Sequence, residues 1–113
     1  MAWKDYIIWE PLTIVAASAI TTSFVAVITI TAPAICMLIK NGTNGDVLLG
    51  IDGTTAKWGF PASSGAAYDM TTNSPTYNQL MLREGTTIYI EWNGSAPSIP
   101  TGNVYIEFME VAV

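Results

Sequence analysis

The fold of this chain is decided by residues Ala34–Pro61, which read AICMLIKNGTNGDVLLGIDGTTAKWGFP. Two apolar runs, Ile35–Ile39 and Val47–Ile51, are separated by a segment with two Asn-Gly pairs. Asn-Gly tolerates positive φ and is a strong hairpin signal. A second turn is expected at Asp52-Gly53, followed by an exposed aromatic loop over Trp58–Pro61. The pattern predicts two core strands joined by a tight reversal, which is typical of a β-protein.

Short segments that favour strands, separated by turns, recur along the rest of the chain. About eight short strands with a turn signal roughly every 8–12 residues favour an antiparallel β-sandwich of the jelly-roll type. We therefore predict a single all-β domain over residues 11–113, preceded by an N-terminal arm at residues 1–10. The predicted strands are Leu12–Ala17, Ile20–Thr31, Ile35–Ile39, Val47–Ile51, Ala66–Met70, Gln79–Leu82, Thr86–Trp92 and Asn103–Val113.

The last predicted strand has acidic residues on both of its faces. Alternation places Val104, Ile106 and Phe108 on one face. Glu110 falls on the same face, and Glu107 falls on the opposite one. Because charged side chains protect exposed sheet edges against pairing with other chains, we expect one of these glutamates to have that role.

The chain carries few charges for its size. Its 113 residues are 50% hydrophobic and 12% charged, whereas an average soluble domain has about 25% charged residues. So few charges indicate that part of the surface is buried against partners, which favours a homo-oligomer or a larger assembly. The alternative is a compact monomer whose outer faces are covered by Thr, Ser and Asn.

Aromatic residues at two places in the chain are candidate interface residues. Trp3, Tyr6 and Trp9 are spaced by three, so they share a face if residues 1–10 form a short helix; an ordered arm is the alternative. Such an arm either packs on its own domain or contacts a neighbouring subunit, where Trp and Tyr bury much area at low entropic cost. Trp58 and Phe60 form a lid on the core, a subunit contact or a sugar-stacking platform.

The sequence lacks the residues that most catalytic and metal sites require. It has no histidine, which excludes a Ser-His-Asp triad and an imidazole base. Turns and solvated strand positions explain its acidic residues, so we predict no enzymatic activity. Cys36, the single cysteine, lies in an apolar run and is interpreted as a buried structural thiol. Because no calcium-loop or phosphate-loop spacing occurs, no metal ion or cofactor is predicted.

The charge pattern argues against nucleic-acid and membrane partners. The chain has a net charge of −5 and four basic residues: Lys4, Lys40, Lys57 and Arg83. They are scattered, so they provide no basic stripe for phosphates.

Residues 11–39 are uncharged, but hydroxyl residues and Pro33 interrupt them, unlike the run of about 20 apolar residues in a transmembrane helix. We expect no secretory leader, since Glu10 and Pro11 interrupt its apolar region.

Four segments of the chain combine turn and strand residues in a recognisable pattern: IKNGTNGDVLLGIDGTTAKWGFPA (39–62), YDMTTN (68–73), REGTTIYIEWNG (83–94) and GNVYIEFMEV (102–111). Together they resemble the small β-sandwich virion proteins of tailed bacteriophages. In that family an Asn-rich turn leads into a DVxxxxDGT strand. A PA turn, a YD(L/M)TTN segment, a (K/E)GTxIYxx strand and a terminal GxVYxxxxxV strand follow. The similarity covers roughly residues 17–113, nearly the whole chain.

The resemblance implies a non-enzymatic structural protein of the virion, in the first place a capsid cement or decoration protein on the outer surface of the head. Such a protein is made in the host cytoplasm and binds across neighbouring major capsid subunits. It is expected to form a homo-oligomer, and trimers are the commoner arrangement in such families. Two alternatives stay open: a tail, collar or fibre-associated virion subunit, and a carbohydrate-binding module that uses Trp58, Phe60 and Trp92.

Overall fold

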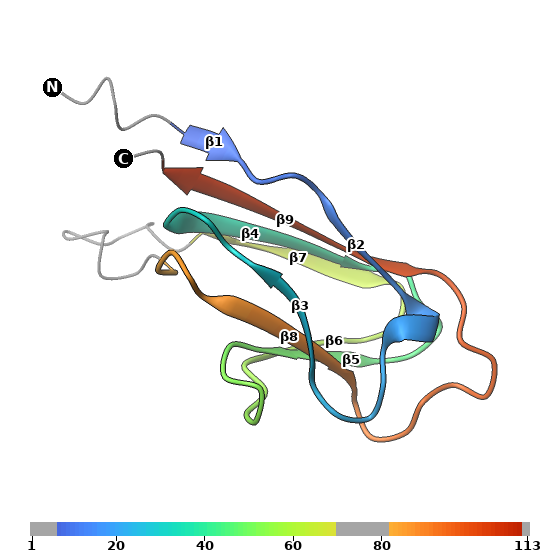
Figure 1. The fold of residues 1–113 in the computed structure, drawn as a ribbon. Coiled ribbons are helices and arrows are strands. Elements are labelled where there is room, and N and C mark those ends of the chain that lie inside the picture. Colours follow the sequence, from blue (N-terminus) through green and yellow to red (C-terminus); the bar gives the residue numbers. More distant parts are fainter. Residues whose placement is uncertain (1–6, 70–81, 112–113) are drawn as a thin grey trace, which may run out of the picture.

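The structure of the chain is a computed structural model, which describes residues 7–69 and 82–111 (Figure 1). Within these ranges the chain forms two antiparallel sheets that pack face to face. The one helical element described is a single 3-10 turn at Ala17–Ala19. The prediction of an all-β sandwich is therefore confirmed.

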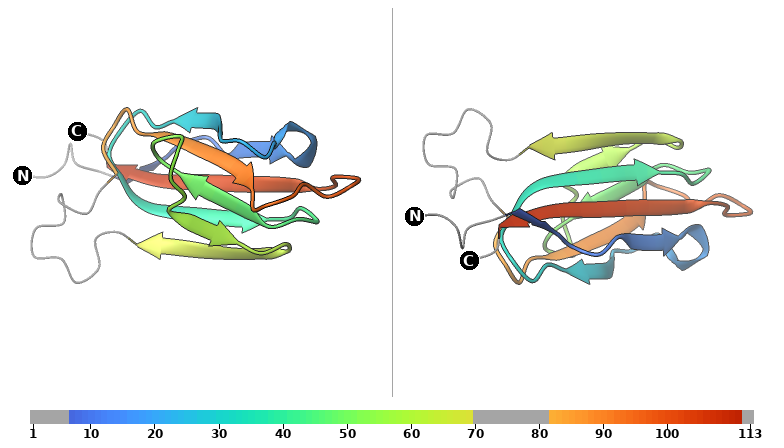
Figure 2. Two further views of the ribbon diagram at one scale, coloured as in Figure 1. Left: turned by 90° about the horizontal axis from the view of Figure 1, so that it is seen from below. Right: turned by 90° about the horizontal axis from the view of Figure 1, so that it is seen from above.

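The five-stranded sheet is built around its longest strand, β9 (Asn103–Val111). On one side of β9 lies β4 (Ala34–Asn41), followed by β7 (Ser64–Asp69). On the other side, β1 (Ile7–Trp9) and β2 (Thr13–Ala16) pair with consecutive parts of β9 (Figure 2). This arrangement brings the two ends of the described chain together in one sheet.

The four-stranded sheet has the order β3 (Val25–Thr29), β8 (Thr87–Trp92), β5 (Val47–Gly50) and β6 (Trp58–Phe60). The sequence does not predict β1 and β6 as strands. Of the predicted strand Gln79–Leu82, residues 79–81 lie outside the described residues, and Leu82 forms an isolated bridge with Ala34.

The core lies between the two sheets and follows from the alternation of side chains. On β9, Val104, Ile106 and Phe108 are fully buried, as the sequence predicts. β8 contributes a second row of buried side chains, Ile88, Ile90 and Trp92. The indole Nε1 of Trp92 donates a hydrogen bond of 2.9 Å to the backbone oxygen of Ile20. Burying side chains of this size stabilises the fold by about 1.5–3 kcal/mol each.

The predicted hairpin between the apolar runs that became β4 and β5 is wrong. β4 pairs with β7 and β9, whereas β5 pairs with β6 and β8, so residues 42–46 cross from one sheet to the other. Neither Gly42 nor Gly45 has a positive φ. Space requires them instead, because a Cβ on Gly42 would lie 2.9 Å from the backbone oxygen of Asn103. A Cβ on Gly45 would lie 2.7 Å from Cγ of Pro97.

Asn41, the last residue of β4, fixes this crossing between the sheets. Its side chain is buried, and its Nδ2 donates to the backbone oxygens of Gly45, Phe60 and Pro61 at 2.9, 3.0 and 3.1 Å. Its Oδ1 accepts hydrogen bonds from the backbone N–H of Thr43 at 3.0 Å and from the Thr43 hydroxyl. One amide therefore ties the end of the five-stranded sheet to β6 of the other sheet.

The predicted aromatic loop is also wrong, because its residues form the strand β6. β6 pairs with β5, and this pairing turns the ring of Phe60 into the core, where it is 4% exposed. The turn before β6 is confirmed: Gly53 has a φ of +77°. The Oδ1 atom of Asp52 accepts hydrogen bonds from the backbone N–H groups of Thr54 and Thr55 at 3.0 and 2.8 Å.

The strands at the two ends of the described chain change two further expectations. Ile7–Trp9 forms β1, so the last part of the predicted arm is paired in the sheet, and Trp9 lies in a strand rather than in a helix. β9 has neighbours on both sides. Neither Glu107 nor Glu110 therefore protects a sheet edge.

Candidate functional site: the outer face of the five-stranded sheet

The five-stranded sheet, whose outer side is viewed face-on in Figure 2 (right), carries an apolar surface on that side. Side chains alternate along a strand, so the buried row of β9 places Tyr105, Glu107 and Met109 on the outside. The register sets Tyr105 between Ile14 of β2 and Lys40 of β4. We define the outer apolar face as Trp9, Leu12, Ile14, Leu38, Ala67, Tyr105 and Met109, with Lys40 and Glu107.

The β1–β2 side of this face projects large apolar side chains into solvent. Trp9, Leu12 and Ile14 are 52%, 47% and 56% exposed. Among the described residues only one other large apolar side chain is classed as exposed, Ile99, which lies on the loop before β9. Single exposed apolar residues are ordinary, but several on one sheet face mark an interaction surface.

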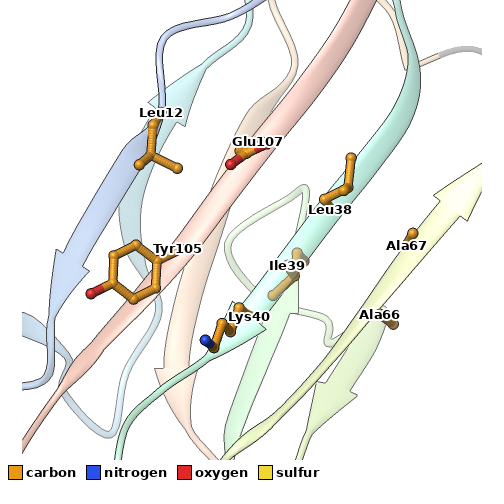
Figure 3. A pocket seen from close by; sticks show the side chains of 8 residues that line it. All are labelled: Leu12, Leu38, Ile39, Lys40, Ala66, Ala67, Tyr105 and Glu107. Atoms are coloured by element: carbon orange, nitrogen blue, oxygen red, sulfur yellow. The ribbon is translucent and has the colours of Figure 1, made fainter.

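A shallow depression of about 440 Å³ lies in the outer apolar face (Figure 3). Leu12 and Tyr105 lie on one side of it, and Ala67 of β7 lies on the other. Its full lining is Leu12, Leu38, Ile39, Lys40, Ala66, Ala67, Tyr105 and Glu107. Sites for small molecules usually enclose most of the ligand. An open hollow lined mainly by aliphatic and small side chains is better suited to side chains that a protein partner inserts.

Two opposite charges sit on the outer apolar face, at neighbouring positions of the sheet. Lys40 lies opposite Tyr105, and Glu107 lies opposite Leu38, so the two charged residues are diagonal neighbours on β4 and β9. Within the described part of the chain neither forms an ion pair. The two charges cancel, so the described side chains of this face carry no net charge.

A second polar feature, the Glu10–Glu110 pair, lies at the end of the inward row of β9. Glu110 is fully buried, and neither of its carboxyl oxygens has a hydrogen-bond partner among the described residues. Glu10 is held nearby: its backbone N–H donates to the Phe108 oxygen at 3.0 Å, and its carboxylate accepts from the Thr31 hydroxyl at 3.2 Å. Burial, together with the adjacent Glu10 carboxylate, raises the pKa of Glu110 to about 7.

These features define what the described residues can do chemically. No group of three or more His, Cys, Asp or Glu side chains gathers there as a possible metal site. Cys36 is half-buried on β4 rather than buried as expected. The Glu10–Glu110 pair can hold a proton, and the protonation state of the pair affects the stability of the fold through electrostatics. The outer apolar face can bury hydrophobic area against a partner, which makes it the candidate functional site.

The structure brings one of the predicted interface residues into this site. Trp9 belongs to the outer apolar face, whereas Trp3 and Tyr6 lie outside the described residues. Trp58 is partly buried and packs against the core, and Phe60 is buried in it. Of the three roles considered for this aromatic pair, the packing supports a lid on the core.

Sequence reasoning did not identify the other residues of the face. Ile14, Leu38 and Tyr105 come from three separate strands, and each is an ordinary apolar strand residue when taken alone. The alternation in β9 does assign Tyr105 and Met109 to the non-core side. What was needed in addition was the strand order, which places β2 and β4 on either side of β9.

Comparisons of the chain with protein-family models, with curated proteins and with solved structures find no match. Among the helices of the described residues, none has the length and apolar character needed to cross a bilayer.

Proposed function

We propose that the chain is a non-enzymatic structural protein of a phage virion, a capsid cement or decoration protein that attaches through its outer apolar face. The observation that carries the proposal is the exposure of Trp9, Leu12 and Ile14 on one side of a sheet that no other described element covers. The resemblance of four segments within residues 39–111 to phage virion proteins supplies the kind of assembly.

We also infer that the connectivity is that of a jelly roll. After β2 the chain places β3 in the four-stranded sheet and β4 in the five-stranded one. β5 and β6 then return to the four-stranded sheet, β7 joins the five-stranded sheet, β8 the four-stranded one and β9 the five-stranded one. Repeated crossing of this kind interleaves the two sheets, as in jelly-roll folds. A rigid domain of this kind is suited to holding neighbouring subunits together.

The mechanism of the proposed protein is mechanical. A copy that sits across two neighbouring capsid subunits must be displaced before those subunits can separate. A standard interface buries about 1,600 Å² in total, and apolar area contributes about 25 cal/mol per Å² before the costs of association are subtracted. Covering the outer apolar face in this way increases the resistance of the head to the pressure of its DNA.

Heads that lack the chain provide a test of this proposal. Purified wild-type protein is expected to bind them and to raise the temperature at which they release DNA. Ile14→Asp is expected to abolish binding, because it puts a charge among the exposed apolar side chains on the β1–β2 side of the outer apolar face. Ile99→Asp is the matched control, since Ile99 is 74% exposed but lies on a loop outside the face.

Two results would contradict the proposal: wild-type protein that does not bind heads, or Ile14→Asp protein that binds as well as the wild type. Binding to tails or collars in place of heads would favour the alternative virion position. The carbohydrate-binding alternative requires an exposed aromatic platform, and Trp58, Phe60 and Trp92 do not form one. Phe60 and Trp92 are 4% and 1% exposed, and Trp58 is packed against the core.

A further inference from the structure

The outer apolar face needs a cover while the protein is free in solution. Trp9, Leu12 and Ile14 are each about half exposed, and the hollow beside them is open. Monomeric proteins rarely leave a contiguous apolar patch of this kind in water. Before the protein reaches a larger assembly, the partner available at the highest local concentration during synthesis is another copy of the same chain.

Electrostatics permits two copies to meet at this face. The chain has a net charge of −5, so two copies repel each other over most orientations. The described side chains of the outer apolar face contribute one positive and one negative charge, Lys40 and Glu107. In an acidic protein, a face whose described side chains carry no net charge is a place where identical molecules can approach with little like-charge repulsion.

The positions of the two charges also fit a symmetric pair. In a two-fold dimer the same patch is used by both molecules, so residue i contacts residue j and j contacts i. Lys40 and Glu107 are diagonal neighbours on adjacent strands, and neither has an ion-pair partner among the described residues of its own chain. If the two-fold axis passes between Lys40 and Glu107, each Lys40 lies opposite the Glu107 of the other copy, and two intermolecular ion pairs form.

We propose that a second copy of this chain covers the outer apolar face in the free protein, as a two-fold dimer in which Lys40 of each copy pairs with Glu107 of the other. The inference names a partner for the same face as the proposed function, but it concerns the protein in solution and does not require the virion role. Attachment to a larger assembly would exchange this contact for another one.

Charge reversal tests the dimer directly. Sedimentation velocity and light scattering of the wild-type chain are expected to give the mass of a dimer that dissociates on dilution. Lys40→Glu turns both ion pairs into Glu–Glu contacts and is expected to raise the dissociation constant about tenfold or more. Glu107→Lys is expected to have a similar effect, and the double variant Lys40→Glu/Glu107→Lys is expected to restore the wild-type value.

Matched controls separate the pairing from the change in net charge. Lys57→Glu and Glu84→Lys make the same charge changes at exposed positions outside the face and are expected to leave the dissociation constant within about twofold of the wild type. The weakening by either single reversal should diminish at high salt, because screening reduces the repulsion. Circular dichroism of each variant checks that the sandwich is intact.

Three outcomes would overturn the inference: a monomeric wild-type chain, a trimer in place of a dimer, or a double variant that stays as weak as the single ones. Binding to heads is measured separately. A wild-type chain that is monomeric but binds heads contradicts only the dimer, and a dimer that binds no particle contradicts only the virion role.

Discussion

Replacing Asn41 by aspartate changes one atom of the buried amide that joins the two sheets. The side chain keeps its shape and its Oδ1 acceptor, to which Thr43 donates twice. The Nδ2 donor becomes an oxygen that faces the backbone oxygens of Gly45, Phe60 and Pro61 at 2.9–3.1 Å. Three attractive contacts of a fully buried group therefore become repulsive ones.

The cost of this substitution can be worked from the same contacts. A buried polar group that loses its partner costs about 1–3 kcal/mol. In its protonated form the introduced carboxyl group can still donate to one of the three oxygens, and the Pro61 oxygen also accepts from the Ser64 hydroxyl at 2.6 Å. The loss is then about 1–3 kcal/mol. An ionised carboxylate loses all three and is buried without a cation, so the loss at neutral pH is larger, on the order of 4 kcal/mol or more.

Urea denaturation at two pH values measures both parts of this prediction. Asn41→Asp is expected to be strongly destabilised at pH 7 and less so at pH 4, because the folded state favours the protonated acid and its pKa in the variant rises above that of the unfolded chain. Asn93→Asp, at an exposed position in another Asn-Gly turn, is the matched control. A loss below about 1 kcal/mol at pH 7, or the same loss in both variants, would refute the role assigned to Asn41.

Two other features of the fold give predictions of their own. The pKa of Glu110 is raised from 4.5 to about 7, so its contribution to stability is full below about pH 4.5 and is lost as the pH rises through 7. The free energy of unfolding should therefore fall by on the order of 3 kcal/mol between pH 4.5 and 8 on account of this group. Glu110→Gln should flatten that decline and Glu84→Gln, at an exposed position, should not; equal pH profiles for wild type and Glu110→Gln would contradict the prediction. Gly94 and Gly102 both have a positive φ, +87° and +85°. A Cβ on Gly94 would touch nothing, whereas one on Gly102 would collide with the backbone oxygen of Gly42. Gly94→Ala should cost about 1 kcal/mol of stability from backbone strain alone, and Gly102→Ala should cost at least about 2 kcal/mol more. Thermal unfolding measures both. Similar melting temperatures for the two variants would contradict the prediction, because they would show that the loop at Gly102 shifts to accommodate the new Cβ.

All the described strands except β1 and β6 could be predicted from the sequence, because the alternation of side chains along a strand is a local property. Ile88 and Ile90 on β8, and Val104, Ile106 and Phe108 on β9, are buried as that alternation indicates. Which strands pair is a long-range property. An Asn-Gly turn makes a hairpin only when the backbones on both sides of it pair with each other.

The crossing between β4 and β5 shows where local reasoning fails. Its turn residues serve a different purpose from the one predicted: Asn41 satisfies buried carbonyl groups, and Gly42 makes room for the oxygen of Asn103. No signal in the sequence distinguishes this use from a hairpin. The same limit applies to the candidate site, since Ile14, Leu38 and Tyr105 become one surface only after β2, β9 and β4 are placed side by side.

The burial of Glu110 illustrates a different limit. Alternation assigns this residue to the core side of β9, but alternation does not tell how deep a position lies. A glutamate near the end of a strand is expected to reach solvent. The structure buries it completely because β1 pairs along the end of β9 and places Ile8 opposite it.

The number of copies in purified particles tests the central claim most directly. If the proposed virion role holds, quantitative mass spectrometry of purified phage particles that contain this chain, measured against the major capsid protein, gives the ratio without any assumption about the binding site. The cement or decoration role predicts a ratio near one copy per major capsid subunit, or a fixed set of copies at each local symmetry axis. A handful of copies per particle, or none, would contradict it.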